Sequence, residues 1–205
     1  MAATRYPGFD VTGAKKSWDA RTREIVTARL EKKTGQPFAF LTPEEAETLK
    51  AIAGHLLFED REELVEYVVA HFDEELSGNA GESQRKADLP PAATFVRQGL
   101  AALDAAAKRR HWRRFVHCRT GQQFELLAAL QIGALEPAPE WSGIPQKELF
   151  KKLLSMAVDA YASHPRVWSE MGYAGPAYPR GYYRIELGVR DPWEPAEAGP
   201  QPSGR

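Results

Sequence analysis

Cysteine, long apolar runs and excess charge are all scarce in this sequence. Its 205 residues include one cysteine, Cys118, which excludes an internal disulfide, a cysteine-built metal site and covalent c-type haem, and fits a reducing compartment. No apolar run approaches the roughly 20 residues of a membrane-spanning helix, so no direct membrane insertion is expected. The 27 Lys and Arg residues nearly balance 28 Asp and Glu, leaving a net charge of −1. That balance argues against a nucleic-acid partner.

The common catalytic motifs are also missing. The sequence has no glycine-rich phosphate loop, no Gly-x-Ser-x-Gly elbow and no His-Glu-x-x-His. None of its five histidines follows a glutamate by three residues, the spacing a di-iron helical bundle needs. His55 and His71 each precede a glutamate by four residues. A stand-alone helical metal-binding protein or enzyme that uses His55, His71 or His164 therefore stays open as the alternative function.

Helical spacing of apolar residues recurs along most of the chain. The clearest example runs from Leu41 to Leu57, where Thr42 and Glu45 form a capping box and Pro43 takes the first helical position. Thr120 and Gln123 resemble a second capping box. The loop-forming residues 79–88 separate two of the helices. The predicted helices are Asp19–Leu30, Leu41–Leu57, Glu62–Leu76, Ala92–Arg110, Thr120–Leu135 and Gln146–Ala162.

No alternating strand pattern persists beyond a few residues, so the sequence predicts an all-α fold. We expect an irregular helical bundle of about five to six helices with an extended aromatic, Pro- and Gly-rich C-terminal segment. The expected divisions are an irregular N-terminal arm (1–18), the helical bundle (19–164), an extended partner-binding tail (165–194) and a disordered end (195–205).

The tail contains WSEMGYAGPAYPRGYYR, in which prolines and glycines prevent a long helix after one further helical turn. Its rings alternate with arginines, and Tyr, Trp and Arg are enriched at interface hot spots. The plainer interpretation is that the rings fill grooves of the chain's own bundle. The predicted partner interface consists of Trp168, Tyr173, Tyr178, Arg180, Tyr182, Arg184, Arg190 and Trp193.

A basic cluster lies at the end of the helix Ala92–Arg110, interleaved with His111 and Trp112. Three interpretations remain open: a solvated helix end whose cations complement the helix dipole, an electrostatic contact with an acidic protein surface or with the chain's own acidic helix Glu62–Leu76, and a phosphate contact. The cluster consists of Lys108, Arg109, Arg110, Arg113 and Arg114.

Three stretches together resemble the gluconate 2-dehydrogenase subunit 3 family: FLTPEEAETLKAIAGHLL, LPP followed by RQGLAALD, and DAYASHPRVWSEMGYAGPAYPRGYYR with DPWE. The resemblance spans most of the chain. It implies a small, cofactor-free accessory subunit of a flavin-dependent oxidoreductase of the glucose-methanol-choline type, which oxidises sugars, sugar acids or polyols. It implies FAD in the large partner subunit, a cytochrome c subunit in some complexes, and no catalytic, cofactor-binding or metal-binding residue in this chain.

The family resemblance also bears on localisation. Several members of that family carry a twin-arginine signal and take the flavoprotein across the membrane with them. The N-terminus MAATRYPGFDVTGAKKSW has no adjacent arginine pair and no apolar stretch. A cytoplasmic complex is therefore expected; the alternatives are a periplasmic complex exported by a signal-bearing partner, or a sequence whose start is missing.

Overall fold

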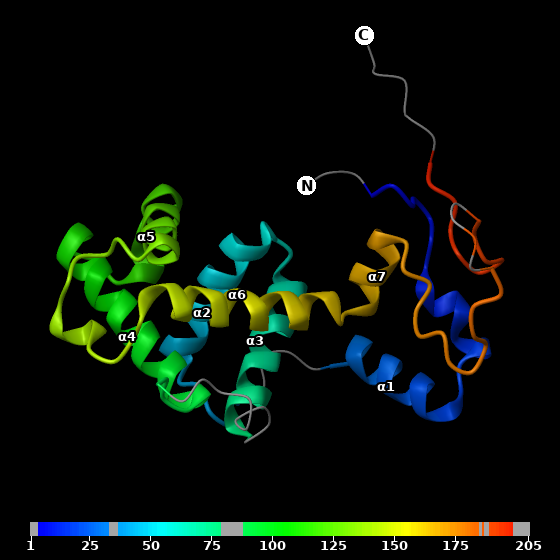
Figure 1. Cartoon of the computed structure of the whole chain (residues 1–205), viewed down its shortest axis with the longest axis horizontal. Helices are drawn as coiled ribbons and strands as arrows, with labels where there is room; N and C mark the ends of the chain where they lie inside the picture. The colour runs from blue at the N-terminus through cyan, green and yellow to red at the C-terminus, as the bar shows by residue number, and fades with distance from the viewer. Residues whose placement is uncertain (1–3, 33–36, 79–87, 185, 187–188, 199–205) are drawn as a thin grey trace, which may run out of the picture. The chain divides into compact units, whose positions relative to one another are not determined.

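The computed structural model describes residues 4–32, 37–78, 88–184, 186 and 189–198, and within them every regular element is a helix (Figure 1). The all-α prediction is confirmed. Of the predicted loop 79–88, only Asp88 lies within the described residues. The α-helices are α1 (Ala20–Leu30), α2 (Pro43–Leu57), α3 (Glu62–Ser77), α4 (Ala92–His111), α5 (Thr120–Ile132), α6 (Gln146–Ala162) and α7 (Pro165–Met171); η1 (Val11–Ser17), η3 (Phe115–His117) and η4 (Pro139–Trp141) are 3-10 helices.

The start of α2 is fixed by both local and distant hydrogen bonds. Thr42 Oγ1 accepts from the Glu45 N–H, and Glu45 accepts from the Thr42 N–H, so the predicted capping box is present. Just before it, the buried carboxylate of Asp73 on α3 accepts three backbone N–H bonds, each 2.8 Å long. These N–H groups belong to Ala39, Phe40 and Leu41, just before α2. Asp73 therefore attaches the segment that leads into α2 to helix α3.

Helices α2 to α6 share one apolar core. α2 packs along α3, and the turn between them is organised by the buried Glu59, which accepts from two backbone N–H groups and from the Arg61 guanidinium. Burial of large aliphatic and aromatic side chains is the main stabilising term of such a core. Its fully buried members include Leu49, Ile52, Leu64, Tyr67, Phe72, Leu103, Phe115, Leu126, Leu130, Leu149 and Leu153.

The corner between α4 and α5 differs from the prediction at the cap. Helix α5 does begin at Thr120, but the reciprocal bond is made by Gln122, whose side chain accepts from the Arg119 N–H. The predicted Thr120–Gln123 box is therefore wrong. Gln123 points inward instead, where its amide donates to the Phe115 carbonyl and pairs with His55.

Contacts divide the chain into two compact units, residues 34–160 and residues 1–33 with 161–205. In the second unit α1 and η1 both pack on α7. Their shared core consists of Val11, Trp18, Val26 and Trp168. This grouping places α1 with the arm and the tail, whereas the sequence-based division placed it in the bundle. Val26 is the one buried residue of α1, and Arg29 adds a hydrogen bond to the Ser163 carbonyl and lies over the Trp168 ring.

Asp73→Ala should lower the free energy of unfolding by about 2–3 kcal/mol, because it strands buried backbone donors at the start of α2. Thermal or denaturant unfolding measures the loss. Glu47→Ala, at an exposed position of α2, is the matched control and should change stability little. Equal stability of the two variants would contradict the anchoring role of Asp73.

Asp104 should make stability depend on pH. Burial raises the pKa of its carboxyl, but the Phe115 N–H and the Arg114 guanidinium outweigh burial and hold that pKa below its usual 3.8. The stabilisation is therefore present above the unfolded-state pKa and is lost as pH falls through the lower folded-state value. Asp104→Asn should cost about 1–2 kcal/mol near neutral pH. Its unfolding temperature should approach that of the parent protein in acid; a gap that stays constant would contradict this origin.

Candidate functional site

The residues from the end of α7 to Gly175 are tightly packed. Trp168 is buried, its indole N–H donates to the Ala162 carbonyl at 2.6 Å, and Tyr173 meets its ring edge-on at 5.3 Å between centroids. At Gly175 the backbone has φ +79°, and an added Cβ would lie 2.8 Å from the Trp18 ring. Only glycine suits both conditions. The described residues that follow, 176–184, 186 and 189–194, are called the aromatic loop below.

Arg180 holds this loop to the N-terminal arm and to residues 174 and 175. Its guanidinium donates to the carbonyls of Ala174 and Gly175 at 2.7 and 3.2 Å, and it lies over the Trp193 ring at 4.8 Å. A longer bond, 3.4 Å, runs to Ser17 Oγ. Arg180 therefore fastens three segments of its own unit, and its side chain is only partly exposed.

Asp191 closes the loop from within. Its carboxylate is 3% exposed and accepts from the N–H groups of Tyr183 and Arg184. The Arg184 guanidinium donates to the Arg190 carbonyl at 3.0 Å, and the rings of Tyr183 and Trp193 meet edge-on. Sequence reasoning did not single out Asp191, although the Asp-Pro pair it begins is a turn signal.

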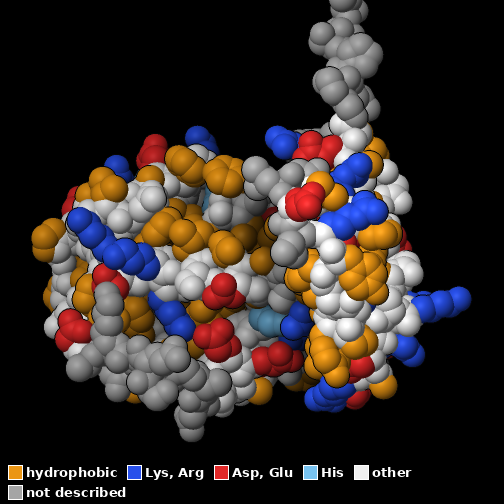
Figure 2. Space-filling model, turned by 45° about the vertical axis from the view of Figure 1, so that its right-hand side comes forward, with side chains coloured by type: hydrophobic (Ala, Val, Ile, Leu, Met, Phe, Trp, Pro, Cys, Tyr) orange, Lys and Arg blue, Asp and Glu red, His pale blue; other side chains and the backbone are white. Residues whose placement is uncertain are grey.

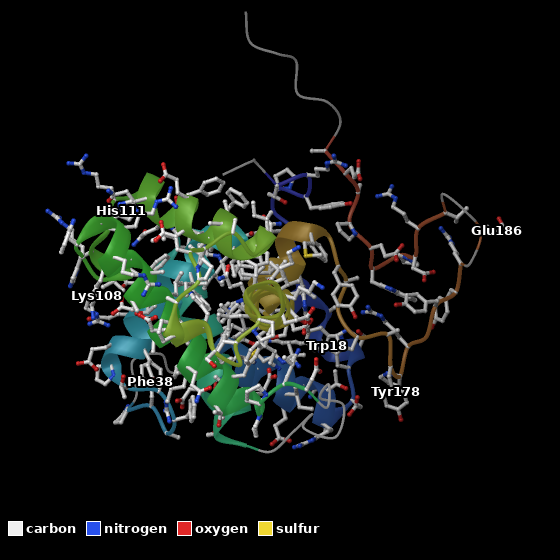
Figure 3. All side chains as sticks on the ribbon, turned by 60° about the vertical axis from the view of Figure 1, so that its left-hand side comes forward. Trp18, Phe38, Lys108, His111, Tyr178 and Glu186 are labelled. Atoms are coloured by element: carbon white, nitrogen blue, oxygen red, sulfur yellow. The ribbon has the colours of Figure 1, made fainter. Side chains whose placement is uncertain are left out.

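The closed loop leaves several predicted interface residues open to solvent. Tyr178 and Tyr182 are 71% and 61% exposed, and Arg184 and Arg190 are exposed as well. Tyr183, which was not among the predicted residues, is 70% exposed. Figure 3 shows Tyr178 pointing away from the ribbon. In Figure 2, hydrophobic side chains (orange) lie next to Lys and Arg side chains (blue) on the surface. Of the eight predicted residues, Trp168 lies in the core, Tyr173 is 41% exposed, and Arg180 and Trp193 support the loop from inside.

The candidate catalytic and metal-binding side chains have structural roles and do not form one cluster. His55 pairs with Gln123, His71 bonds to the Tyr67 carbonyl, and His164 caps α7 by accepting from the Arg166 N–H. Burial raises the pKa of the Cys118 thiol, which disfavours the reactive thiolate. Over the described ranges, no three His, Cys, Asp or Glu side chains are grouped to hold a metal ion. Nor does any described helix have the length and apolar character needed to cross a membrane.

An apolar groove lies on unit 34–160, between α2, α5 and α6. Its volume is about 280 Å³, and Phe58 and Phe124 at its border are 82% and 54% exposed. Exposed apolar surface of this kind is typical of protein contacts. The lining residues are His55, Leu56, Phe58, Phe124, Leu127, Ala128, Gln131, Phe150 and Leu154.

The basic cluster is partly neutralised. Asp104 pairs with Lys108 and Arg114, and Glu140 pairs with Arg109. Lys108 and His111 lie near the same end of α4 in Figure 3. These ion pairs account for three of the five cations, and Arg110 and Arg113 remain to be explained.

Asp191→Ala should open the aromatic loop, because the N–H groups of Tyr183 and Arg184 lose their acceptor. Limited trypsin digestion should then cut faster after Arg180 and Arg184. Glu24→Ala, which removes an exposed carboxylate on α1, is the control and should leave the cleavage rate unchanged. Identical rates for Asp191→Ala and the parent protein would show that Asp191 does not close the loop.

The family model for gluconate 2-dehydrogenase subunit 3 matches residues 43–175. The match runs from the first residue of α2 to Gly175, so Trp168 and Tyr173 lie inside it and the aromatic loop follows it. No match was found among curated proteins or among solved structures. Because the match covers well over half of the chain, the resemblance seen in the sequence is confirmed: the chain belongs to the gluconate 2-dehydrogenase subunit 3 family.

Proposed function

We propose that this chain is a non-catalytic small subunit that binds and stabilises a flavin-dependent dehydrogenase of sugars, sugar acids or polyols. Family membership supports an accessory role in a dehydrogenase complex. The observation that carries the proposed interface is the aromatic loop, in which contacts of Arg180 and of the buried Asp191 support a backbone whose three tyrosine rings are open to solvent. FAD belongs to the partner subunit in this proposal, and this chain supplies no catalytic, cofactor-binding or metal-binding residue.

Pre-organisation is the physical advantage of such a loop. Ordering a flexible segment on binding costs free energy for every side chain immobilised, and a loop already closed by hydrogen bonds avoids much of that cost. Tyrosine rings then offer large contact area with a hydroxyl for one polar contact. The α2–α5–α6 groove adds apolar surface within the family match.

Stabilisation follows from mass action. A subunit that binds only the folded dehydrogenase stabilises it by an amount that grows with concentration over the dissociation constant. No contact with the flavin is needed. A cytochrome c subunit that accepts the electrons can belong to the same complex. We place the complex in the cytoplasm, with export beside a signal-bearing partner as the alternative.

Co-expression with a flavin-dependent dehydrogenase of the glucose-methanol-choline type encoded beside this chain tests the proposal. A yellow complex should co-purify, and the dehydrogenase alone should unfold at a lower temperature. Tyr182→Ala combined with Arg190→Glu should weaken the complex by about tenfold or more. These two side chains are exposed, so the free subunit should keep its unfolding temperature.

Ile25→Ala is the matched control, since Ile25 is 39% exposed on α1 of the same unit but outside the loop. Its affinity should equal that of the parent protein. If the two proteins elute separately and the dehydrogenase is equally stable and active alone, the subunit function is wrong. If the complex forms and the loop variant binds normally, the interface lies elsewhere.

A further inference from the structure

Two helices end in bulky residues where the backbone favours glycine. α5 and α7 end at Gly133 and Gly172, with φ of 71° and 74°. α2 and α4 end instead at Phe58 and Trp112, with φ of 51° and 58°. A bulky side chain in this left-handed region costs about 1–2 kcal/mol. For the fold alone, glycine would serve better at both ends.

No contact of the Trp112 ring with another described side chain offsets this strain. It is 90% exposed, and it makes no ring contact or hydrogen bond with any other described side chain. Strained residues of this kind concentrate at functional positions, and an outward tryptophan is a common anchor at protein interfaces. The ring is thus displayed at the end of α4.

Arginines without an ion-pair partner lie near Trp112 in the sequence. Arg110 and Arg113 are exposed on either side of it in sequence, and among the described residues neither has a carboxylate within ion-pair distance. Arg119, also exposed and without such a partner, immediately precedes α5. Gln122 in the first turn of α5 bonds to His111, the residue before Trp112. The carboxylates of this region, Asp104 and Glu140, are already paired with Lys108, Arg109 and Arg114.

We propose that Trp112, with Arg110, Arg113 and Arg119, docks an acidic segment of a protein partner. Guanidinium groups bind carboxylates through paired, charge-assisted hydrogen bonds, and the indole covers an apolar side chain between them. The inference does not depend on the proposed dehydrogenase, since it concerns unit 34–160 and uses no residue of the aromatic loop.

Other polyanions fit this surface less well. Binding to a nucleic-acid backbone at physiological salt relies on many phosphate contacts, whereas this surface offers few free cations on a chain of net charge −1. Attachment to an anionic membrane needs a polybasic segment with a broad apolar face or a lipid anchor, and here a single ring is displayed.

The test uses a fluorescein-labelled peptide in which glutamate alternates with leucine, titrated with the full chain at low salt. We expect saturable binding that weakens as salt is added. The same peptide with glutamine in place of glutamate should bind at least about tenfold more weakly. Trp112→Gly should weaken binding of the acidic peptide about tenfold, and Arg110→Glu with Arg113→Glu by more.

Trp112→Gly separates docking from folding, since relief of the strained backbone should leave the unfolding temperature equal to or above that of the parent protein. Val158→Ala is the matched control, because Val158 is an exposed apolar residue of α6 that belongs neither to this surface nor to the apolar groove, and it should leave peptide affinity unchanged. The proposal is overturned if the acidic peptide shows no saturable binding or if Trp112→Gly binds it normally. Tighter binding to single-stranded DNA or to phosphatidylserine vesicles than to the peptide would also overturn it.

Discussion

The packing of Trp18 and Val11 against Gly175 is the contact on which the arrangement of both chain ends depends. A Cβ at Gly175 would lie 2.8 Å from Trp18 Cζ2 and 3.1 Å from Val11 Cγ2, so these groups already fill the space. Both side chains are buried with Val26 and Trp168. Residues separated by most of the sequence therefore form one small core, and the aromatic loop begins from a fixed point on it.

From that fixed point, polar contacts give the loop a definite shape. Arg180 reaches back to the carbonyls of Ala174 and Gly175, and Asp191 accepts from the backbone of Tyr183 and Arg184. These contacts occupy charged groups that would otherwise be free to meet a partner. What stays open is a set of tyrosine rings on a pre-shaped backbone, which is how a binding surface keeps its ordering cost low.

Local signals predicted the helices, and distant contacts explain what they missed. Thr42, Pro43 and Glu45 start α2 as expected because a capping box is complete within four residues. At α5 the Thr120–Gln123 pattern predicted the wrong box, because Gln123 points inward to the Phe115 carbonyl and His55, which no local pattern reveals. The apolar spacing of α1 predicted a helix but did not say that Val26 would face Trp18 and Trp168.

At the candidate site too, local sequence predicted some features, and contacts between distant residues decided the others. Ring and arginine content identified residues 165–194 as unusual, and two of the three predicted tyrosines, Tyr178 and Tyr182, are more than half exposed. Sequence could not separate these from Trp168, because a buried and an exposed ring have the same local context in a Pro- and Gly-rich segment. The strained Trp112 was visible only as an aromatic among basic residues; its left-handed backbone emerged from the structure.

Hydrogen exchange of the chain, with and without the proposed flavoprotein partner, tests the central claim most directly. If the aromatic loop is the interface, the backbone amides from Ala177 to Arg184 should exchange more slowly in the complex, while those of α1 keep their rates. A complex that forms while these loop amides exchange at the same rate as in the free subunit would contradict the account.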